Sequence, residues 1–220
     1  MRLRTRAVIF DMDGVITDTM PYHFRVWKEI FVREGMDVSR EDIYKREGQK
    51  GIESLREIFA EYGKIFNETY ARGMLKEKEK RFKRVFKRRF IAGSRSFLRQ
   101  LHKHGFKLAL VTGTSRHEAV HLLPAELFNM FDVTVCGCEV QNGKPHPEPY
   151  LTALKKMSLR PRDAVVIENA PFGIHSAKAA GIRCLGIETS LPKSYLRQAD
   201  AVFHSFKDLA SRVCFEKYEP

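Results

Sequence analysis

The chain has 220 residues, of which 43% are hydrophobic, and carries a net charge of +12 at pH 7. This length and apolar content suffice for a folded core and exclude a disordered or fibrous protein. No apolar stretch reaches the roughly 20 residues that span a bilayer, and the N-terminal apolar segment is too short for a signal peptide, so we expect a cytoplasmic protein without a membrane partner.

The first predicted element is a short buried strand over residues 7–10, with the sequence AVIF. Its β-branched and aromatic residues favour the interior of a parallel sheet. Asp11 and Asp13 follow this strand directly. Charged groups at this place indicate a functional site, because open α/β sheets carry their chemistry at the carboxyl ends of the strands.

Helical patterns fill the next segment, where no strand signal occurs. Helices are predicted over residues 21–35, 52–61 and 67–87. Residues 72–90 hold ten Lys or Arg against two Glu. This basic stretch is compatible with a solvated helix, whose apolar residues share one face, or with an electrostatic funnel for phosphorylated substrates. A nucleic-acid partner is the least favoured interpretation, because no nucleic-acid-binding motif accompanies the charge.

From residue 91 onwards, apolar runs alternate with helical segments. The predicted strands cover residues 107–112, 133–136, 164–168, 183–187 and 201–203. The helices between and after them cover residues 94–104, 116–123, 148–157, 172–180 and 206–213. Such alternation implies right-handed β-α-β crossovers and an α/β fold with a doubly wound, mostly parallel, Rossmann-like sheet. We therefore predict a core domain of residues 1–18 and 91–220, interrupted by an all-helical cap domain of residues 19–90.

Reactive or phosphate-binding residues follow several of these strands, whose carboxyl ends meet at one edge of a parallel sheet. Backbone amides and hydroxyls at the start of the helix after residues 107–112 suit a phosphate. Pro145 and Pro147 hold the loop around Lys144 extended, which can aim its ammonium. Oxygen donors after the first strand and at residues 168–169 suit Mg²⁺. The candidates are Asp11, Asp13, Thr112, Gly113, Thr114, Lys144, Glu168 and Asn169.

This ordered set of motifs resembles the haloacid dehalogenase superfamily of phosphotransferases. The pattern is D-x-D-G-V, a strand ending in Thr, a Lys followed by Pro, and an acidic strand end. Within that superfamily, FDMDGVITDTMPYHFRVWK is similar to β-phosphoglucomutase and its phosphatase relatives with a helical cap. The resemblance covers nearly the whole chain and implies that the helical insert is a lid over the strand ends.

The resemblance also implies roles for individual residues. Asp11 would be the nucleophile that attacks phosphorus and forms an aspartyl-phosphate. Asp13 would be the general acid for the leaving oxygen and then the base for the attacking water. Thr112 and Lys144 would hold the transferring phosphoryl oxygens, and Lys144 would also offset the repulsion between the phosphate and Asp11.

A magnesium ion is the cofactor that the resemblance implies. The side chain of Asp11, the backbone carbonyl of Asp13 and Asn169 would hold it, and Glu168 would reach it directly or through water. Many family members carry an aspartate where this chain has Asn169. The amide keeps an oxygen donor and removes a negative charge, so we predict that magnesium binds more weakly and that Glu168 carries more of its coordination.

Four residues are predicted to contact substrate: Gly113, Thr114, Arg116 and His23. The first two belong to the predicted phosphate loop, and Arg116 lies just past it. For Arg116, an exposed side chain at a helix start without a substrate contact is an equally favoured interpretation. His23 lies where the relatives have a cap histidine near the acid/base aspartate, and a helix-surface histidine beside Trp27 is the alternative.

The residues favour a phosphatase over a mutase. The related mutases use a cap arginine to grip the second phosphate of a sugar bisphosphate, and Gly51 stands at that place here. Without a guanidinium the second phosphate loses its best clamp, although Arg46 or Lys50 stay open as replacements. We predict a Mg²⁺-dependent phosphatase of a small phosphorylated metabolite, with sugar phosphates as the favoured class. The alternatives are a β-phosphoglucomutase and a noncatalytic binding protein that uses the basic cap.

Overall fold

The computed structural model describes residues 1–218, and its centre is a six-stranded parallel sheet. The strands follow the order β4-β3-β2-β5-β6-β7, and each neighbouring pair is parallel. The order reverses between β2 and β5, which is where open α/β sheets form a crevice at their carboxyl ends. The six strands are β2 (Ala7–Phe10), β3 (Lys107–Val111), β4 (Val133–Val135), β5 (Ala164–Glu168), β6 (Arg183–Ile187) and β7 (Ala201–Phe203).

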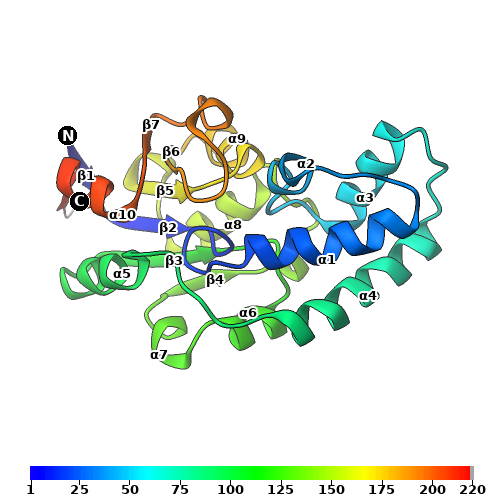
Figure 1. The fold of residues 1–220 in the computed structure, drawn as a ribbon. Coiled ribbons are helices and arrows are strands. Elements are labelled where there is room, and N and C mark those ends of the chain that lie inside the picture. The colour runs from blue at the N-terminus through cyan, green and yellow to red at the C-terminus, as the bar shows by residue number, and fades with distance from the viewer. Residues whose placement is uncertain (219–220) are drawn as a thin grey trace.

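Helices cover both faces of this sheet (Figure 1). Since side chains alternate along a strand, Ile9 of β2 packs with Tyr150 on one face, while Phe10 packs with Phe97 and Phe131 on the other. The doubly wound α/β fold is thus confirmed. The helices are α5 (Ser94–Lys103), α6 (Arg116–Leu122), α7 (Ala125–Phe128), α8 (Glu148–Met157), α9 (Pro171–Ala179) and α10 (Phe206–Arg212), with short 3₁₀ turns at Gly137–Glu139, Pro161–Asp163 and Lys193–Tyr195.

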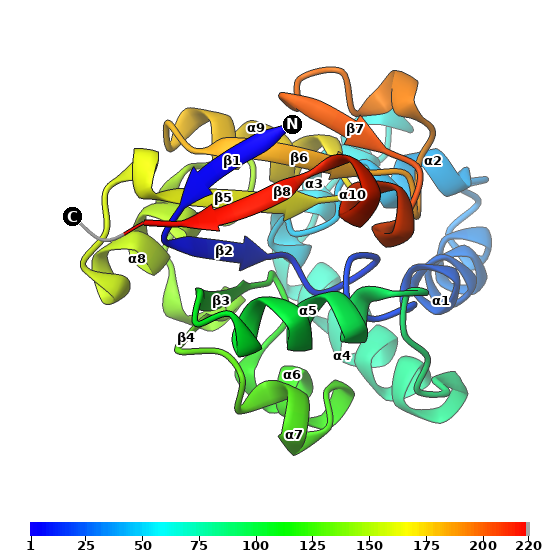
Figure 2. The same ribbon diagram turned by 90° about the vertical axis from the view of Figure 1, so that its left-hand side faces the viewer.

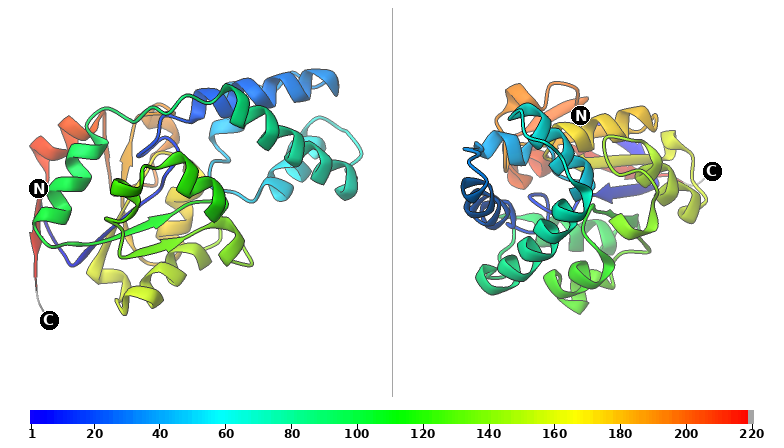
Figure 3. Two further views of the ribbon diagram at one scale, coloured as in Figure 1. Left: turned by 90° about the horizontal axis from the view of Figure 1, so that it is seen from below. Right: turned by 90° about the vertical axis from the view of Figure 1, so that its right-hand side faces the viewer.

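Four further helices lie between β2 and α5, beyond the carboxyl ends of the sheet. Figure 3 shows them, coloured from blue to turquoise, projecting from one end of the molecule. They are α1 (Met20–Arg33), α2 (Arg40–Tyr44), α3 (Gly51–Glu61) and α4 (Glu68–Val85). The sequence patterns missed α2, which is only five residues long and begins at a capping box between Ser39 and Asp42. No helix in the described part of the chain combines the length and apolar content needed to cross a bilayer.

The chain crosses between these helices and the sheet twice, and the two crossings run side by side. Thr17 and Phe90 form an antiparallel bridge. Next to it, the amide of Asp18 donates to the carbonyl of Arg89 at 3.0 Å. Backbone hydrogen bonds therefore tie the entry and the exit of the helical segment together.

A second, two-stranded sheet was not predicted. In it, β1 (Arg2–Thr5) pairs in parallel with β8 (Cys214–Lys217), so that the first and the last strand of the chain lie side by side (Figure 2). In β1, two charged residues alternate with buried Leu3 and Thr5. Each strand has four residues. So short an alternating pattern gains its stability from tertiary pairing and gives little signal in the sequence.

Asp163 fastens the start of β5 to the chain ends. Its carboxylate accepts hydrogen bonds from Tyr218 and from the amide of Arg160, and its carbonyl accepts one from the Thr5 hydroxyl at 3.0 Å. The side chain of Asp163 is buried. The hydrogen bond from Tyr218 and those from Arg160 lower the pKa of Asp163 to about 2.

We expect Asp163→Asn to destabilise the protein by about 2 kcal/mol at neutral pH, the usual cost of losing hydrogen bonds to a charged group. A lowered pKa stabilises the fold above the ordinary pKa of 3.8, and this stabilisation is lost as pH falls toward about 2. The variant should therefore show a lower melting temperature at pH 7 and a smaller further loss between about pH 4 and pH 2. Equal acid sensitivity of both proteins would contradict this role.

Candidate active site

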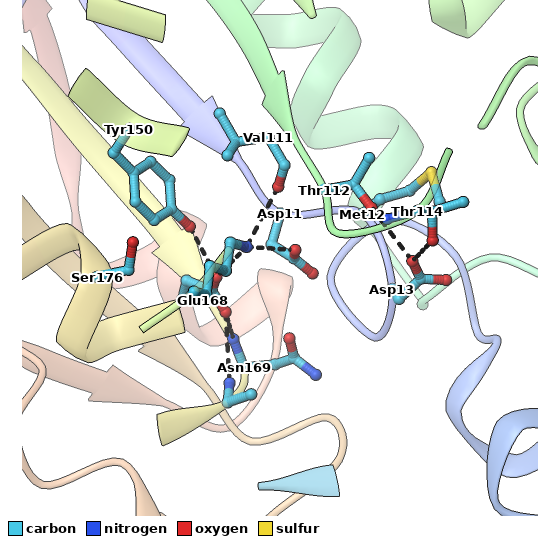
Figure 4. A network of polar contacts seen from close by, with 12 residues as sticks. Asp11, Met12, Asp13, Val111, Thr112, Thr114, Tyr150, Glu168, Asn169 and Ser176 are labelled. Atoms are coloured by element: carbon cyan, nitrogen blue, oxygen red, sulfur yellow. Dashed lines mark hydrogen bonds and ion pairs between the residues drawn. The ribbon is translucent and has the colours of Figure 1, made fainter. Parts of the chain in front are cut away.

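Three buried charged side chains meet at the carboxyl ends of β2 and β5 (Figure 4). The Lys144 ammonium donates to Asp11 Oδ1 at 2.7 Å and to Glu168 Oε1 at 2.6 Å. A third hydrogen bond runs to the carbonyl of Val111 at 3.2 Å. Lys144 is only 1% exposed, as are Asp11 and Glu168. The fold thus brings together residues from β2, β5 and the loop before α8.

The charges of this cluster do not balance. Burial raises the pKa of Asp11 to about 8, because the ion pair with Lys144 offsets only part of the desolvation while Glu168 and Asp13 add repulsion. Burial alone would lower the pKa of Lys144, but the two neighbouring carboxylates outweigh it and raise that pKa. The Lys144 ammonium therefore stays charged. Because two carboxylates face this one ammonium, a further positive charge beside Asp11 would be favourable.

Glu168 orients its neighbours and has no free oxygen. Its Oε1 accepts from Lys144 and from the Tyr150 hydroxyl at 2.7 Å, while its Oε2 accepts from the amide of Asn169 at 3.0 Å. The ring of Tyr150 also lies 5.1 Å from the Lys144 ammonium. Sequence reasoning missed Tyr150, which sits on the apolar face of α8. The available signal was that a buried tyrosine hydroxyl needs a hydrogen-bond partner.

Two buried oxygen atoms in this cluster lack any hydrogen-bond partner within residues 1–218: Asp11 Oδ2 and Asn169 Oδ1. The amide group of Asn169 is held by donation to the Ser190 hydroxyl at 2.8 Å. Gly14, at φ +82°, keeps this space open, since a side chain there would meet Asn169 and Ser190. Unsatisfied buried oxygens are rare, and two of them in one cluster fit a cation-binding site.

The donor set fits magnesium. Within the described residues, no group of three or more His, Cys, Asp or Glu is placed to hold a metal ion. Magnesium needs fewer protein ligands than that, because it keeps several waters and takes substrate oxygens. One carboxylate oxygen of Asp11 and one amide oxygen of Asn169 are donors of the type it prefers.

Asp13 lies in a separate cluster of hydroxyl and imidazole groups. Its Oδ1 accepts from Thr19 at 2.5 Å and lies 3.4 Å from His23 Nε2. Its Oδ2 accepts from Thr114 at 3.0 Å and from Thr112 at 3.4 Å. Burial would raise the pKa of Asp13, but the hydrogen bonds from His23 and Thr19 outweigh it and lower that pKa. Asp13 is therefore ionised in this arrangement and can accept a proton.

A cavity of about 290 Å³ opens above these groups, between the helical segment and the sheet. His23, Gly113 and Thr114 line it, as do Glu47 and Lys78. Its size is near the lower end of the range of about 300–1,000 Å³ for ligand pockets. The cavity therefore suits a small metabolite.

The loop between α2 and α3 closes tightly onto the site. A Cβ atom at Gly113 would lie 2.9 Å from the carbonyl oxygen of Gly48, and one at Gly48 would meet the side chain of Lys144. Lys50 donates to the carbonyl of Val140 at 2.8 Å. This approach was not predicted, because it depends on how the helical segment folds back over the sheet.

Comparison with known proteins agrees with this geometry. Residues 8–187 match the model of the haloacid dehalogenase-like hydrolases. The chain belongs to this family. A phosphorylated carbohydrates phosphatase of Thermotoga maritima is 35% identical over 191 residues, which cover 84% of this chain and 86% of that protein.

Two further members of the family are similar over almost their whole length. The β-phosphoglucomutase of Bacillus subtilis is 30% identical over 220 residues, which cover 97% of this chain and 96% of that protein. The crystal structure of β-phosphoglucomutase from Clostridium difficile matches with a TM-score of 0.80 at 27% identity and covers 93% of both chains. The haloacid dehalogenase resemblance of the motifs is therefore confirmed.

One predicted substrate contact of this family member lies away from the site. The guanidinium of Arg116 donates to Glu139 at 2.7 Å and to the carbonyl of Thr134 at 3.3 Å. Arg116 does not line the cavity, in contrast to Gly113, Thr114 and His23. The structure differs from the prediction for Arg116, because Glu139, in the 3₁₀ turn after β4, holds its charge at the surface.

Proposed function

We propose that the protein is a magnesium-dependent phosphatase that hydrolyses a small phosphorylated metabolite, with sugar phosphates as the favoured class. The observation that carries this proposal is the buried Oδ2 of Asp11, which has no hydrogen-bond partner within residues 1–218, beside a lysine that holds the other oxygen of the same carboxylate. An oxygen so placed can bind a cation or attack phosphorus. The similarity to a phosphatase of phosphorylated carbohydrates supports the substrate class.

In the proposed reaction, Asp11 attacks phosphorus and the bond between phosphorus and the leaving oxygen breaks. Asp13 gives its proton to that oxygen, then takes a proton from the water that attacks the aspartyl-phosphate, which releases phosphate and restores Asp11. Since Asp13 is ionised at rest, it must first take a proton, and a singly protonated phosphate ester can give this proton to it on binding. The hydroxyls of Thr112 and Thr114 donate hydrogen bonds to Asp13, and they can rotate to donate to phosphoryl oxygens instead.

The metal site in this proposal consists of Asp11 Oδ2 and Asn169 Oδ1, together with the Asp13 carbonyl that the family resemblance implies. A bound Mg²⁺ would neutralise charge and allow two anions to approach each other. Because Glu168 already accepts hydrogen bonds at both oxygens, its part is to orient Lys144 and to contact the metal through water.

We expect Asn169→Asp to bind Mg²⁺ about tenfold more tightly, since it adds a negative charge next to the cation. The Ser190 hydroxyl can then donate to the new carboxylate and keep its orientation. The rise of melting temperature with Mg²⁺ concentration measures this affinity without substrate. Asn129→Asp, an exposed change directly after α7, is the matched control. An affinity equal to that of the wild type would exclude Asn169 from the metal site.

Residues 19–90 would act as a cap domain on a core domain of residues 1–18 and 91–220. The four helices at one end of the sheet and the two adjacent crossings support this division. Residues 17–19 and 90–93 would then be the hinges. Opening of the cap would admit substrate, and closure would exclude water from the phosphoryl group.

The arrangement of the cap favours hydrolysis over a mutase reaction. The guanidinium of Arg46 is paired with Glu57 and Glu61, and Lys50 donates to backbone carbonyls. Neither is free to clamp a second phosphate. Gly51, which lines the cavity, has no side chain to do so.

The noncatalytic alternative rests on the basic stretch of residues 72–90. Several of its charges are neutralised on α4 itself, where Arg72 pairs with Glu68, Arg81 with Glu77 and Lys83 with Glu79. Glu77 and Glu79 are already set against the ten Lys and Arg of the stretch, and the pair with Glu68 lowers its net charge by one more. A binding protein of this kind would keep its affinity for polyanions after the active-site carboxylates are replaced.

Phosphate release from a panel of phosphorylated metabolites tests the proposal, with either Mg²⁺ or EDTA present. We expect release from at least one sugar or polyol phosphate with Mg²⁺ and none with EDTA. Conversion of β-glucose 1-phosphate to glucose 6-phosphate with a bisphosphate primer, without phosphate release, would establish the mutase instead. Release that EDTA leaves unchanged would overturn the metal requirement.

A further inference from the structure

Tyr150 lies behind the charged cluster and binds one of its carboxylates. It belongs to α8, is fully buried, and donates its hydroxyl hydrogen to Glu168 Oε1 at 2.7 Å. It does not line the cavity above the site, and Figure 4 shows it on the side of Glu168 away from Asp13. Any effect of Tyr150 on the reaction must therefore pass through Glu168 or Lys144.

The Lys144 ammonium is shared between two carboxylates. Its three hydrogens go to Asp11 at 2.7 Å, to Glu168 at 2.6 Å and to the carbonyl of Val111 at 3.2 Å. The proposed reaction needs the first of these contacts, because Lys144 would offset the charge of Asp11 and hold the phosphoryl oxygens. A stronger attraction of the ammonium to Glu168 would weaken that contact.

The carboxylate of Glu168 has no room to move. A Cβ atom at Gly173, in the first turn of α9, would overlap it, and the amides of Asn169 and Ala170 donate to its second oxygen. The lysine head group, in contrast, sits at the end of a flexible chain. If Glu168 Oε1 lost a donor, the ammonium would therefore shift toward the carboxylate, and the carboxylate would stay in place.

Two features of Tyr150 oppose such a shift. Its hydroxyl is the second donor on Glu168 Oε1, which lowers the negative charge that this oxygen presents to the ammonium. Its ring lies 5.1 Å from the Lys144 ammonium, within the reach of a cation–π contact. Gly48 packs against the same lysine side chain. The ring and the glycine thus enclose the lysine, and the hydroxyl balances its attraction to Glu168.

We propose that Tyr150 is a positioning residue, which acts through Glu168 to keep the Lys144 ammonium at Asp11 and at the phosphoryl group. This inference rests on the proposed phosphatase function and adds to it a residue outside the cavity. The effect should fall on kcat more than on KM, because the phosphoryl group requires the ammonium most in the transition state.

Tyr150→Phe removes the hydroxyl and keeps the ring. For p-nitrophenyl phosphate with Mg²⁺, we expect kcat to fall about tenfold, as for a lost hydrogen bond to a charged group, while KM changes less than about twofold. The melting temperature of the same preparation shows whether the fold is kept. Tyr195→Phe, a change at an exposed tyrosine, is the matched control and should have the kinetics of the wild type.

A double-mutant cycle with Glu168→Gln separates positioning from a structural role. An amide has no charge with which to draw the ammonium, so Tyr150→Phe should lower kcat less than about twofold in that background. Calorimetric binding of orthovanadate in the presence of Mg²⁺ gives a second readout that needs no turnover. We expect Tyr150→Phe to weaken this binding about tenfold in the wild-type background and less than about twofold in Glu168→Gln.

Two results would overturn the positioning role. Equal losses of kcat and of vanadate affinity in both backgrounds would mean that Tyr150 acts on the fold or directly on Lys144. An unchanged kcat in Tyr150→Phe would mean that the hydroxyl does not hold the ammonium in place. In both cases hydrolysis by the wild type leaves the phosphatase proposal standing. A wild type that releases no phosphate from p-nitrophenyl phosphate or from the metabolite panel overturns the two proposals together.

Discussion

Asp11→Asn is expected to lower phosphate release at least about 10⁴-fold, because an amide is no nucleophile toward phosphorus. The fold should survive this change. Asparagine has nearly the same shape, Lys144 keeps its hydrogen bond to Glu168 at 2.6 Å, and the loss of one carboxylate relieves repulsion within the cluster. Steady-state phosphate release and the melting temperature of the same preparation check both expectations.

The matched control for this variant is Asp37→Asn, an exposed aspartate next to Lys28. It should keep full activity. Activity of Asp11→Asn within about tenfold of the wild type would place the nucleophile on another residue, since loss of a nucleophile ordinarily costs several orders of magnitude. A large fall in melting temperature would instead show that Asp11 is needed for the fold.

The second large effect is expected for Lys144→Met, which removes the ammonium and nearly keeps the volume. Asp11 and Glu168 would then face each other without a cation. Removing one partner of a buried ion pair typically destabilises by about 3–5 kcal/mol, and we expect a loss in this range. Activity should fall about 10³-fold, because the phosphoryl oxygens and Asp11 lose their common positive charge.

Urea unfolding and phosphate release separate the two consequences of the lysine change. Mg²⁺ should restore part of the lost stability, since a cation at Asp11 relieves the same repulsion. Lys144→Arg keeps the positive charge and tests whether the site also requires the size of the lysine side chain. A guanidinium is larger and has no room where Gly48 packs against this side chain. Lys155→Met on the exposed side of α8 is the control. If Lys144→Met has the stability and activity of the wild type, the ion pair of Lys144 with Asp11 and Glu168 contributes to neither.

The sequence was most informative where chemistry follows a buried strand. Asp11 and Glu168 could be placed together because parallel strands end at one edge of the sheet, and the structure joins them through Lys144. Other contacts could not be predicted, since they depend on how distant segments pack. Tyr150 is hidden in an apolar helix face, and Glu47 enters the cavity only because the loop after α2 folds back over β3.

Arg116 shows the opposite error. A helix start next to a phosphate loop favours a substrate contact, but the same place on the surface offers Glu139 as a partner. The pairing of β1 with β8 was missed for a related reason, because it joins residues near the two ends of the chain. Local patterns indicate the elements, and long-range packing decides which surface partners they meet.

The covalent intermediate is the most direct test of the central claim. Enzyme mixed with substrate and Mg²⁺ is quenched in acid during turnover, treated with borohydride, and only then digested with trypsin and analysed by tandem mass spectrometry. The account predicts a phosphoryl group on Asp11, within the peptide of residues 7–25 that follows Arg6. Borohydride should convert the acyl phosphate at that position to homoserine. Turnover with the phosphoryl group on another residue, or with no phosphorylated enzyme at any quench time, would contradict the account.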